Sequence, residues 1–230
     1  MIEIRNLMFG YGGKPILNNL NACFETGSVH VILGESGCGK TTLLRLICGL
    51  EQPNSGAILI NGKIVSDAGP NRVPPGLPVP PHRRDTAMVF QDPALWPHMT
   101  VLENLLFCSP LSRGEAERKA YALLEKAGIR SLADRKPHRL SGGEARRTAL
   151  LRAIMSGRSH LLMDEPLVNL DPELKNRLLA WIGALQAEEK RTLVYVTHDR
   201  EEARMLAGKP FRLAGGVLAP VKEDPDPCER

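Results

Sequence analysis

One octapeptide constrains the fold of this chain of 230 residues more than any other segment. Gly-Glu-Ser-Gly-Cys-Gly-Lys-Thr, residues 34–41, lies between a mostly apolar run at 29–33 and a helical pattern at 40–48. A glycine-rich turn from a strand into a helix aims backbone N–H groups and the positive end of the helix at one point. Lys40 adds a charge there, and the Thr41 hydroxyl can ligate Mg²⁺. The octapeptide therefore predicts a nucleoside triphosphate site. The residues expected to hold the phosphates are Gly34, Glu35, Ser36, Gly37, Cys38, Gly39, Lys40, Thr41 and Thr42.

Composition and charge exclude several classes of protein. Hydrophobic residues make up 43% of the chain and charged residues 24%, which are the proportions of a folded globular protein. The net charge of +4 is spread along the chain and is too weak to argue for a nucleic-acid binder, so no nucleic-acid partner is expected. No apolar run approaches the roughly 18 residues of a membrane span, and the N-terminus lacks the apolar core of a signal peptide. Widely spaced cysteines without a Cys-x-x-Cys pair favour the reduced cytosol, so any membrane role is expected to come from a partner.

The order of elements predicts an α/β fold with a mainly parallel sheet, because strand-like runs alternate with helical ones. The expected strands are residues 2–8, 19–24, 29–33, 86–90, 160–163 and 193–196, with a terminal hairpin at 211–221. Capping pairs predict three helix starts, at Thr100 with Glu103, Asp171 with Pro172, and Asp199 with Glu202. A charged helical pattern at 113–155 predicts an inserted helical part. Repeated prolines between residues 66 and 84 predict a surface excursion that is neither helix nor central strand.

A second motif with chemistry is the mostly apolar run at 160–163, which ends in Asp164 and Glu165. Asp164 can hold the Mg²⁺ shell, and Glu165 can polarise an attacking water. Taken alone, the segment could be an acidic surface turn, but its pairing with the phosphate loop favours the chemical interpretation. The two motifs do not separate a kinase from a GTPase or an ATPase.

Leu-Ser-Gly-Gly-Glu at residues 140–144 lies between these motifs, and at this point the sequence resembles the ATP-binding subunit of ABC transporters. The resemblance extends along the whole chain in the family's order. It includes Gln91 at the end of a strand, Asn-Leu-Asp at 169–171, and Thr-His-Asp at 197–199. Tyr11 matches the family's adenine-stacking aromatic residue. Phe9 is an alternative for that role, and Tyr11 could equally well only pack at the end of its strand.

The resemblance implies a fold and a domain division. The fold is a P-loop nucleoside triphosphatase core with a mainly parallel sheet, an N-terminal antiparallel β portion and an inserted helical subdomain. The chain would be a single ABC ATPase domain. Within it, residues 1–90 and 156–230 would form the ATP-binding core, and residues 91–155 the helical signature subdomain.

The same resemblance implies roles for the site residues. Glu165 would act as the general base, and His198 would contact the γ-phosphate of ATP. Mg²⁺ would be held by Thr41, Gln91 and Asp164, and Gln91 would also contact water and signal to a membrane partner.

The Leu-Ser-Gly-Gly-Glu motif implies a dimer. In the family, two copies meet head to tail, so Ser141, Gly142 and Gly143 of each copy would cover the ATP held by the other. The residues themselves also support a plainer interpretation, in which Ser141 and Glu144 form a capping box at the start of a helix.

Further partners follow from the resemblance. Residues 95–104 are similar to the segment that importer-type ATPases use near the coupling helix of a membrane subunit. An exposed Trp96 would fit a docking surface there, although a core tryptophan is the commoner case. The chain would drive a separate permease at the cytoplasmic face of the membrane, for uptake of a small solute, with a solute-binding protein as a further candidate partner. Regulation through the C-terminal domain of sugar- and polyamine-type importers is not expected. The alternatives are a soluble ABC ATPase of DNA repair, chromosome or translation type, an export-type ABC ATPase, and a P-loop kinase.

Overall fold

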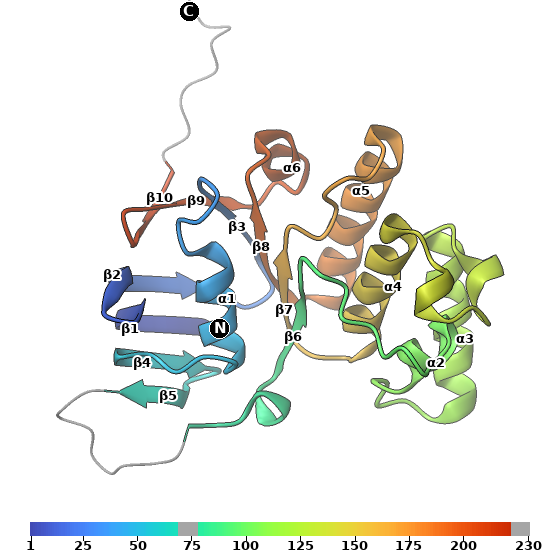
Figure 1. Cartoon of the computed structure of the whole chain (residues 1–230), viewed down its shortest axis with the longest axis horizontal. Coiled ribbons are helices and arrows are strands. Elements are labelled where there is room, and N and C mark those ends of the chain that lie inside the picture. The colour runs from blue at the N-terminus through green and yellow to red at the C-terminus, as the bar shows by residue number, and fades with distance from the viewer. Residues whose placement is uncertain (69–77, 222–230) are drawn as a thin grey trace, which may run out of the picture.

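The computed structural model describes residues 1–68 and 78–221, which form two sheets and a group of helices (Figure 1). Figure 1 shows a small N-terminal sheet on one side, the strands of a second sheet in the middle, and most helices beyond them. The structure confirms the predicted fold class, an α/β protein with an N-terminal antiparallel portion, a mainly parallel sheet and an inserted helical part.

The N-terminal sheet is antiparallel, with the strand order β2-β1-β4-β5. Its strands are β1 (Ile2–Tyr11), β2 (Lys14–Phe24), β4 (Ser55–Ile60) and β5 (Lys63–Ala68). Ile2 and Ile4 of β1 are buried in alternation, as expected for a sheet with one face on a core. The sequence predicted β1 and β2 but neither β4 nor β5. Asn61 and Gly62, both with positive φ, form the two-residue turn between these two strands.

The second sheet has the strand order β10-β9-β3-β8-β7-β6. Its strands are β3 (Val29–Leu33), β6 (Thr86–Val89), β7 (His160–Asp164), β8 (Thr192–Thr197), β9 (Lys209–Ala214) and β10 (Val217–Pro220). All neighbours pair in parallel except β10, which forms the predicted terminal hairpin with β9. The carboxyl ends of β3, β6, β7 and β8 therefore meet at one edge of the sheet.

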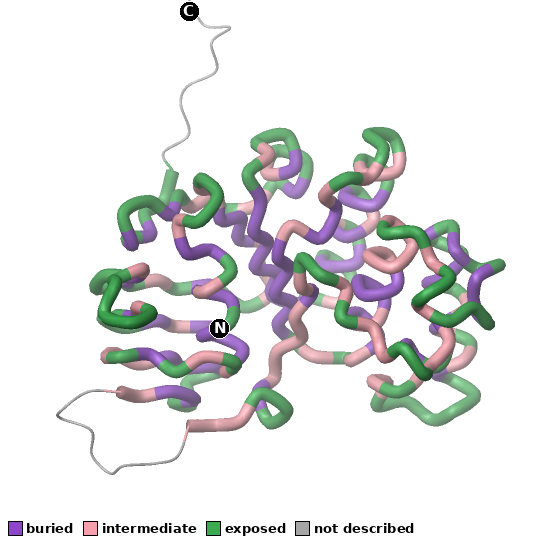
Figure 2. Tube along the Cα trace, in the orientation of Figure 1, coloured by how far each residue is buried: buried purple, intermediate pink, exposed green. Residues whose placement is uncertain are grey.

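This sheet separates two hydrophobic cores. One core holds α1 (Lys40–Cys48), the N-terminal sheet and one face of the second sheet, with Ile32 and Leu162. The other core holds the remaining helices and the opposite face, with Val31 and Leu161. Figure 2 shows the buried residues along the central strands and the elements on either side. Because both faces are covered, the central strands read as nearly continuous apolar runs.

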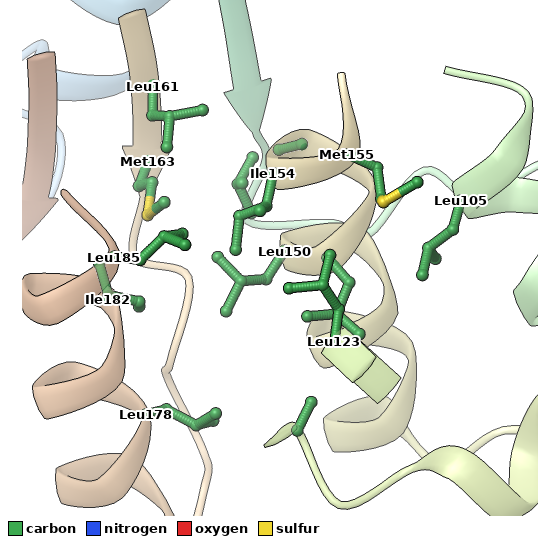
Figure 3. Packing of buried hydrophobic residues seen from close by; sticks show 14 of the residues in the cluster. Leu105, Leu123, Leu150, Ile154, Met155, Leu161, Met163, Leu178, Ile182 and Leu185 are labelled. Atoms are coloured by element: carbon green, nitrogen blue, oxygen red, sulfur yellow. The ribbon is translucent and has the colours of Figure 1, made fainter. Parts of the chain in front are cut away.

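Five α-helices follow α1 in the described part of the chain. The inserted part holds α2 (Val101–Leu106), α3 (Arg113–Lys126) and α4 (Gly142–Met155), and α5 (Pro172–Glu189) and α6 (Arg200–Met205) follow β7 and β8. Figure 3 shows Leu150 and Ile154 of α4 between α5, which presents Ile182 and Leu185, and the side of α2 and α3. The inserted helices are thus anchored to the sheet through α4 and α5.

Thr100, Asp171 and Asp199 are all N-cap residues, as predicted, and two of the three predicted pairs are confirmed. Thr100 and Glu103 form a capping box at α2, and the Asp171 side chain accepts a hydrogen bond from the Leu174 N–H at α5. The third prediction is wrong in its partner. Asp199 accepts from the Glu201 N–H, whereas the Glu202 side chain is buried and bonds elsewhere. A glutamate three residues after a cap residue can either close a capping box or turn into the core. For Glu202, the bonds to Tyr195 and Thr197 decide in favour of the core.

The proline-rich segment is partly regular. Residues 66–68 belong to β5, which contradicts the predicted excursion from residue 66, and Pro81–Arg83 forms a 3-10 turn. The prediction for residues 69–77 lies outside the described residues. Arg84, only 1% exposed, closes the segment. Its guanidinium donates to the carbonyl oxygens of Val79, Leu46, Ile47 and Val65 at 2.8 to 3.1 Å and to Ser66 Oγ at 2.7 Å.

Among the residues that the structure describes, no helix is both long enough and apolar enough to cross a membrane. This agrees with the absence of a long apolar run in the sequence.

Arg84→Met is expected to lower the free energy of unfolding by about 2 to 4 kcal/mol, because several buried oxygens would lose their donor at once. Arg83→Met makes the same change at an exposed neighbour and should cost less than about 0.5 kcal/mol. Urea unfolding of both variants measures the difference. Equal midpoints would contradict an anchoring role for Arg84.

Candidate nucleotide-binding site

Segments that carry the predicted site residues meet at the carboxyl edge of the second sheet. The octapeptide follows β3, Gln91 follows β6, Asp164 ends β7, and His198 follows β8. A cavity of about 260 Å³, hereafter the phosphate cavity, lies at this edge. It is lined by Ile16, Ser36, Gly37, Gly39, Lys40, Thr41, Thr42, Gln91, Asp164 and Glu165. The predicted metal set (Thr41, Gln91 and Asp164) and the predicted base Glu165 thus border one space with most of the loop.

The remaining loop residues, Gly34, Glu35 and Cys38, do not line this cavity. Gly34 is required for a different reason, because a Cβ there would lie 2.7 Å from the Leu213 carbonyl oxygen. Gly39 has φ of 105°, and a Cβ would lie 2.8 Å from Ile16 Cγ2. Ile16 itself was not predicted as a site residue. It lies on β2 in the other sheet, so no pattern near the octapeptide points to it.

Lys40 is buried at the start of α1, and its ammonium group lies inside the loop. Nζ donates to the carbonyl oxygens of Gly34 at 2.7 Å and Glu35 at 2.9 Å. These bonds fold the loop around a positive charge. Together with the N-terminal end of α1, the charge makes the cavity attractive to phosphate groups.

Asp164 lines the cavity together with Lys40 and Thr41 and is only 3% exposed. Burial raises the pKa of Asp164, and the Thr41 hydroxyl and the Lys40 ammonium oppose this effect. Thr41, Asp164 and Gln91 offer oxygen ligands, the kind that Mg²⁺ prefers. The described residues contain no cluster of three or more acidic, histidine or cysteine side chains able to hold a metal. The oxygen atoms of Thr41, Asp164 and Gln91, which border the same cavity as the phosphate loop, fit a Mg²⁺ ion that shares its coordination with phosphate oxygens, as is usual for this ion.

Glu165 and His198 form a pair at the end of the cavity. Glu165 adopts φ of 45°, and its N–H donates to the Val196 carbonyl oxygen at 3.0 Å. Its Oε1 lies 3.1 Å from Nδ1 of His198, whose side chain is 59% exposed. His198 borders a neighbouring cavity and not the phosphate cavity. Glu165 lines both cavities, so it connects His198, the predicted γ-phosphate contact, with the phosphate site.

Tyr11 ends β1 and is 48% exposed. Its hydroxyl donates to Glu51 Oε1 at 3.1 Å, and its ring meets the Phe9 ring edge-on, with 4.8 Å between centroids. Phe9, the alternative stacking residue, is buried beneath it. Neither ring lines the phosphate cavity, but Tyr11 alone of the two presents its ring at the surface.

Ser141, Gly142 and Gly143, the signature residues predicted to cover the ATP of a second copy, do not line this cavity. Ser141 caps α4 in a capping box with Glu144, which confirms the plainer interpretation of the motif. Ser141 and Gly142 are exposed. The motif and the phosphate loop also belong to helices on opposite faces of the second sheet, because α4 packs against one face and α1 against the other.

Trp96, considered above as exposed or buried, is neither. Its ring is half-buried between Phe107, at 4.8 Å between centroids, and the Arg152 guanidinium, 4.7 Å from the ring centre. The buried Asn104 side chain holds the turn before α2 by accepting from the Trp96 N–H and donating to the Thr100 carbonyl. Phe107 is 64% exposed beside this segment.

Two functional candidates, Lys175 and Glu202, were missed from the sequence. Lys175 of α5 lies beside Glu202 and Asp199 of the α6 region, and the three border the cavity next to His198. The position of Lys175, four residues after the cap Asp171, carries no local sign of this contact.

The fold and the cavity define a nucleotide-binding protein of the phosphate-loop class. A protein-family model described as "ABC transporter" matches residues 17–168. The chain therefore belongs to the ABC transporter family, which confirms the resemblance found in the sequence.

Curated relatives agree with this family. The chain is 41% identical over 212 residues to the spermidine/putrescine import ATP-binding protein PotA of Legionella pneumophila subsp. pneumophila (strain Philadelphia 1), covering 91% of this chain and 55% of PotA. It is 42% identical over 214 residues to the trehalose/maltose import ATP-binding protein MalK of Thermococcus litoralis, covering 92% of this chain and 56% of MalK. The chain thus spans little more than half the length of these two relatives.

Solved structures show the same architecture. The chain matches the dimeric, post-hydrolysis state of the ATP-binding cassette MJ0796 bound to ADP and Pi with a TM-score of 0.81 and 27% sequence identity. The match covers 97% of this chain and 100% of that structure's chain.

Asp164→Asn is expected to stabilise the nucleotide-free protein at neutral pH, because it removes a charge from a buried position. A carboxyl group with a raised pKa in the folded state binds more protons there than in the unfolded state. The cost that an ionised Asp164 adds to the free energy of folding is absent at acid pH. It grows as the pH rises above the ordinary aspartate pKa of about 3.9. Urea titrations should therefore show the advantage of the variant widening from about pH 4 to pH 7.

The control for this prediction is Asp134→Asn, the same change at an exposed carboxylate. It should show no comparable trend with pH. An Asp164→Asn protein no more stable than wild type at pH 7 would contradict the assignment of Asp164 as a destabilised buried acid.

Proposed function

We propose that this chain is the ATP-hydrolysing subunit of an ABC importer, active as a pair of cassettes that drives a separate permease. The observation that carries the proposal is the shared cavity. Most of the phosphate loop, Gln91, Asp164 and Glu165 border one space, which would supply phosphate binding, metal ligands and a base together. Membership of the ABC transporter family supports the choice of ATPase over kinase.

ATP would bind with its phosphates in the loop between Ser36 and Thr42, where Lys40 and the N-terminal end of α1 offset their charge. Thr41, Asp164 and Gln91 would hold Mg²⁺. When bound, this ion neutralises negative charge on the phosphate oxygens during phosphoryl transfer. The exposed ring of Tyr11 would stack on the base, held in place by its bond to Glu51.

In hydrolysis, Glu165 would orient a water and accept its proton, since its carboxylate borders the phosphate cavity. His198 would contact the γ-phosphate and keep the Glu165 side chain in place through the 3.1 Å contact. Gln91 would place the water relative to the phosphate. Each group acts by position and charge, which is what phosphoryl transfer requires of a protein.

The separation of the signature from the cavity supports a dimer. The start of α4 is exposed at Ser141 and Gly142, and its capping box takes up the N–H groups of Ser141 and Glu144. The N–H groups of Gly142 and Gly143 precede the first main-chain hydrogen bond of the helix and stay available to a ligand. Such an end attracts anions, yet it does not border this chain's own phosphate cavity. A second copy would supply the phosphate, as the dimeric cassette relative bound to ADP and Pi suggests.

The importer assignment is supported by the relatives, since PotA and MalK are named as import ATP-binding proteins. The half-buried Trp96 and the exposed Phe107 would meet the permease from the helical side, in the segment before and after α2. The solute would be chosen by the permease and a solute-binding protein.

Glu165→Gln is expected to lower the rate of ATP hydrolysis by about 10² to 10⁴ while ATP binding is kept, because the base is lost and the phosphate contacts remain. The trapped ATP should also favour a dimer. Phosphate release, binding of a fluorescent ATP analogue and size-exclusion chromatography measure the three effects. Glu173→Gln, an exposed change on the first turn of α5, is the matched control. Hydrolysis near the wild-type rate would remove Glu165 from the role of base.

Ser141→Arg is expected to reduce hydrolysis on the order of 100-fold with little effect on ATP binding by the monomer, because the signature would serve the opposite copy. The change also removes a helix cap. Thr100→Arg, which breaks the equivalent capping box at α2, controls for that loss and should leave hydrolysis by the isolated chain largely intact. Equal loss of ATP binding by monomeric Ser141→Arg would contradict the arrangement in trans.

A further inference from the structure

Lys175 lies at the centre of a charged cluster beside Glu165 and His198. Its Nζ atom is 3.1 Å from Asp199 Oδ2 and 3.0 Å from Glu202 Oε1. Helices α5 and α6 contact each other next to β8 (Figure 1). A cavity of about 220 Å³ adjoins the cluster. It is lined by Glu165, Val168, Asn169, Lys175, Thr197, His198, Asp199 and Glu202.

Glu202 is the buried member of the cluster, with only 4% of its surface exposed. Its Oε2 accepts from the Tyr195 hydroxyl at 3.0 Å and from Thr197 Oγ1 at 2.8 Å, while Lys175 meets its Oε1. Burial and the Glu202 carboxylate raise the pKa of Tyr195. Partial burial disfavours the charge on Lys175, but the two carboxylates outweigh it and raise the pKa of Lys175. Lys175 is therefore charged at neutral pH and neutralises an otherwise buried anion.

The cluster fixes the backbone on both sides of His198. Thr197 Oγ1 accepts from the Asp199 N–H at 3.0 Å, and Asp199 Oδ1 accepts from the Glu201 N–H at 2.8 Å. Among the described residues, the His198 side chain has one hydrogen-bonding contact, with Glu165. The orientation of the His198 side chain therefore depends on that contact and on the backbone of Thr197 and Asp199, which the cluster holds in place.

Lys175 also belongs to α5, the helix that follows Glu165 in the sequence after a short turn. Its N–H donates to the Asp171 carbonyl oxygen at 2.9 Å, within the first turn of α5. The turn that precedes it contains Asn169, which has φ of 60° and borders the same cavity. The side chain of Lys175 therefore ties this turn to the turn that carries His198.

We infer that Lys175 is a positioning residue for hydrolysis, which holds His198 against Glu165 through its bonds to Asp199 and Glu202. The inference rests on the proposed function for its effect on rate, but the placement of His198 is a property of the chain alone. Removing the ammonium group would leave Glu202 buried without its counter-charge. The turn from β8 to α6 would then shift, and a displacement of about 1 Å at a reacting group can cost about 100-fold in rate.

The experiment compares Lys175→Met with Lys175→Arg and with Lys119→Met in the full chain. Lys119 forms a 3.1 Å ion pair with Glu189 at the far end of α5, so its loss is a matched change remote from the site. Lys175→Met should lower kcat for ATP on the order of 10- to 100-fold with KM changed less than about twofold. Lys175→Arg should restore most of the rate, and Lys119→Met should leave it unchanged.

A second readout does not need hydrolysis. The ¹⁵N signals of the His198 ring, recorded without nucleotide, should change in Lys175→Met and in Glu202→Gln but not in Lys119→Met. Glu202→Gln serves if Lys175→Met fails to fold, because it leaves no unpaired buried charge. Unchanged His198 signals in a folded Lys175→Met or Glu202→Gln protein would overturn the inference, as would equal losses of kcat in Lys175→Met and Lys119→Met. Absence of hydrolysis in the wild-type chain would instead count against the proposed function, with the ring signals still testing Lys175.

Discussion

The parallel pairing of β3, β8, β7 and β6 is the constraint on which the rest of the structure depends. Parallel strands end at the same edge, so four segments far apart in the sequence are brought to one place by backbone hydrogen bonds alone. The register matters as much as the direction, because Leu33 pairs with Thr197 and Asp164 with Val196. A slip of one residue would turn every side chain to the other face, exchanging the residues of the two cores.

The buried charges at the carboxyl edge of the second sheet lower the stability of the folded protein. Lys40 and Asp164 are both buried beside the phosphate cavity, and the raised pKa of Asp164 shows that its surroundings disfavour the ionised form. Sites built to bind a highly charged ligand commonly sacrifice stability in this way. The described structure compensates elsewhere, with two apolar cores and with the saturated hydrogen bonding of Arg84.

Much of the fold could be predicted from the sequence because the decisive signals are local. The bounds of β3 and α1 were predicted to the residue, since an apolar run and a glycine-rich turn mark them directly. The missed strand β5 carries mixed polar and apolar residues, with Lys63 and Ile64 exposed, and β4 offers only a short apolar run at residues 57–60 after Ser55 and Gly56. Such a strand gains its stability from its neighbour and gives little periodic signal of its own.

The candidate site shows the same division. The motifs predicted that the phosphate loop, Asp164 and Glu165 act together, and the structure brings most of the loop, Gln91 and these two carboxylates to one cavity. Contacts between distant elements could not be predicted, as Lys175 with Glu202 and Tyr11 with Glu51 illustrate. The proposed roles of Glu165, His198 and Ser141 involve a nucleotide and a second copy, which no contact within one chain contains.

Within the described residues, the two cores meet through the central strands, whose side chains alternate between them. Substitutions that reshape α2, α3 or the outer surface of α4 therefore have no direct route to the packing around α1. The outer surfaces of α2 and α3 can therefore vary without repacking the residues around the phosphate loop. Two surfaces of one small domain can in this way change at different rates, one set by nucleotide and the other by whatever the inserted helices meet.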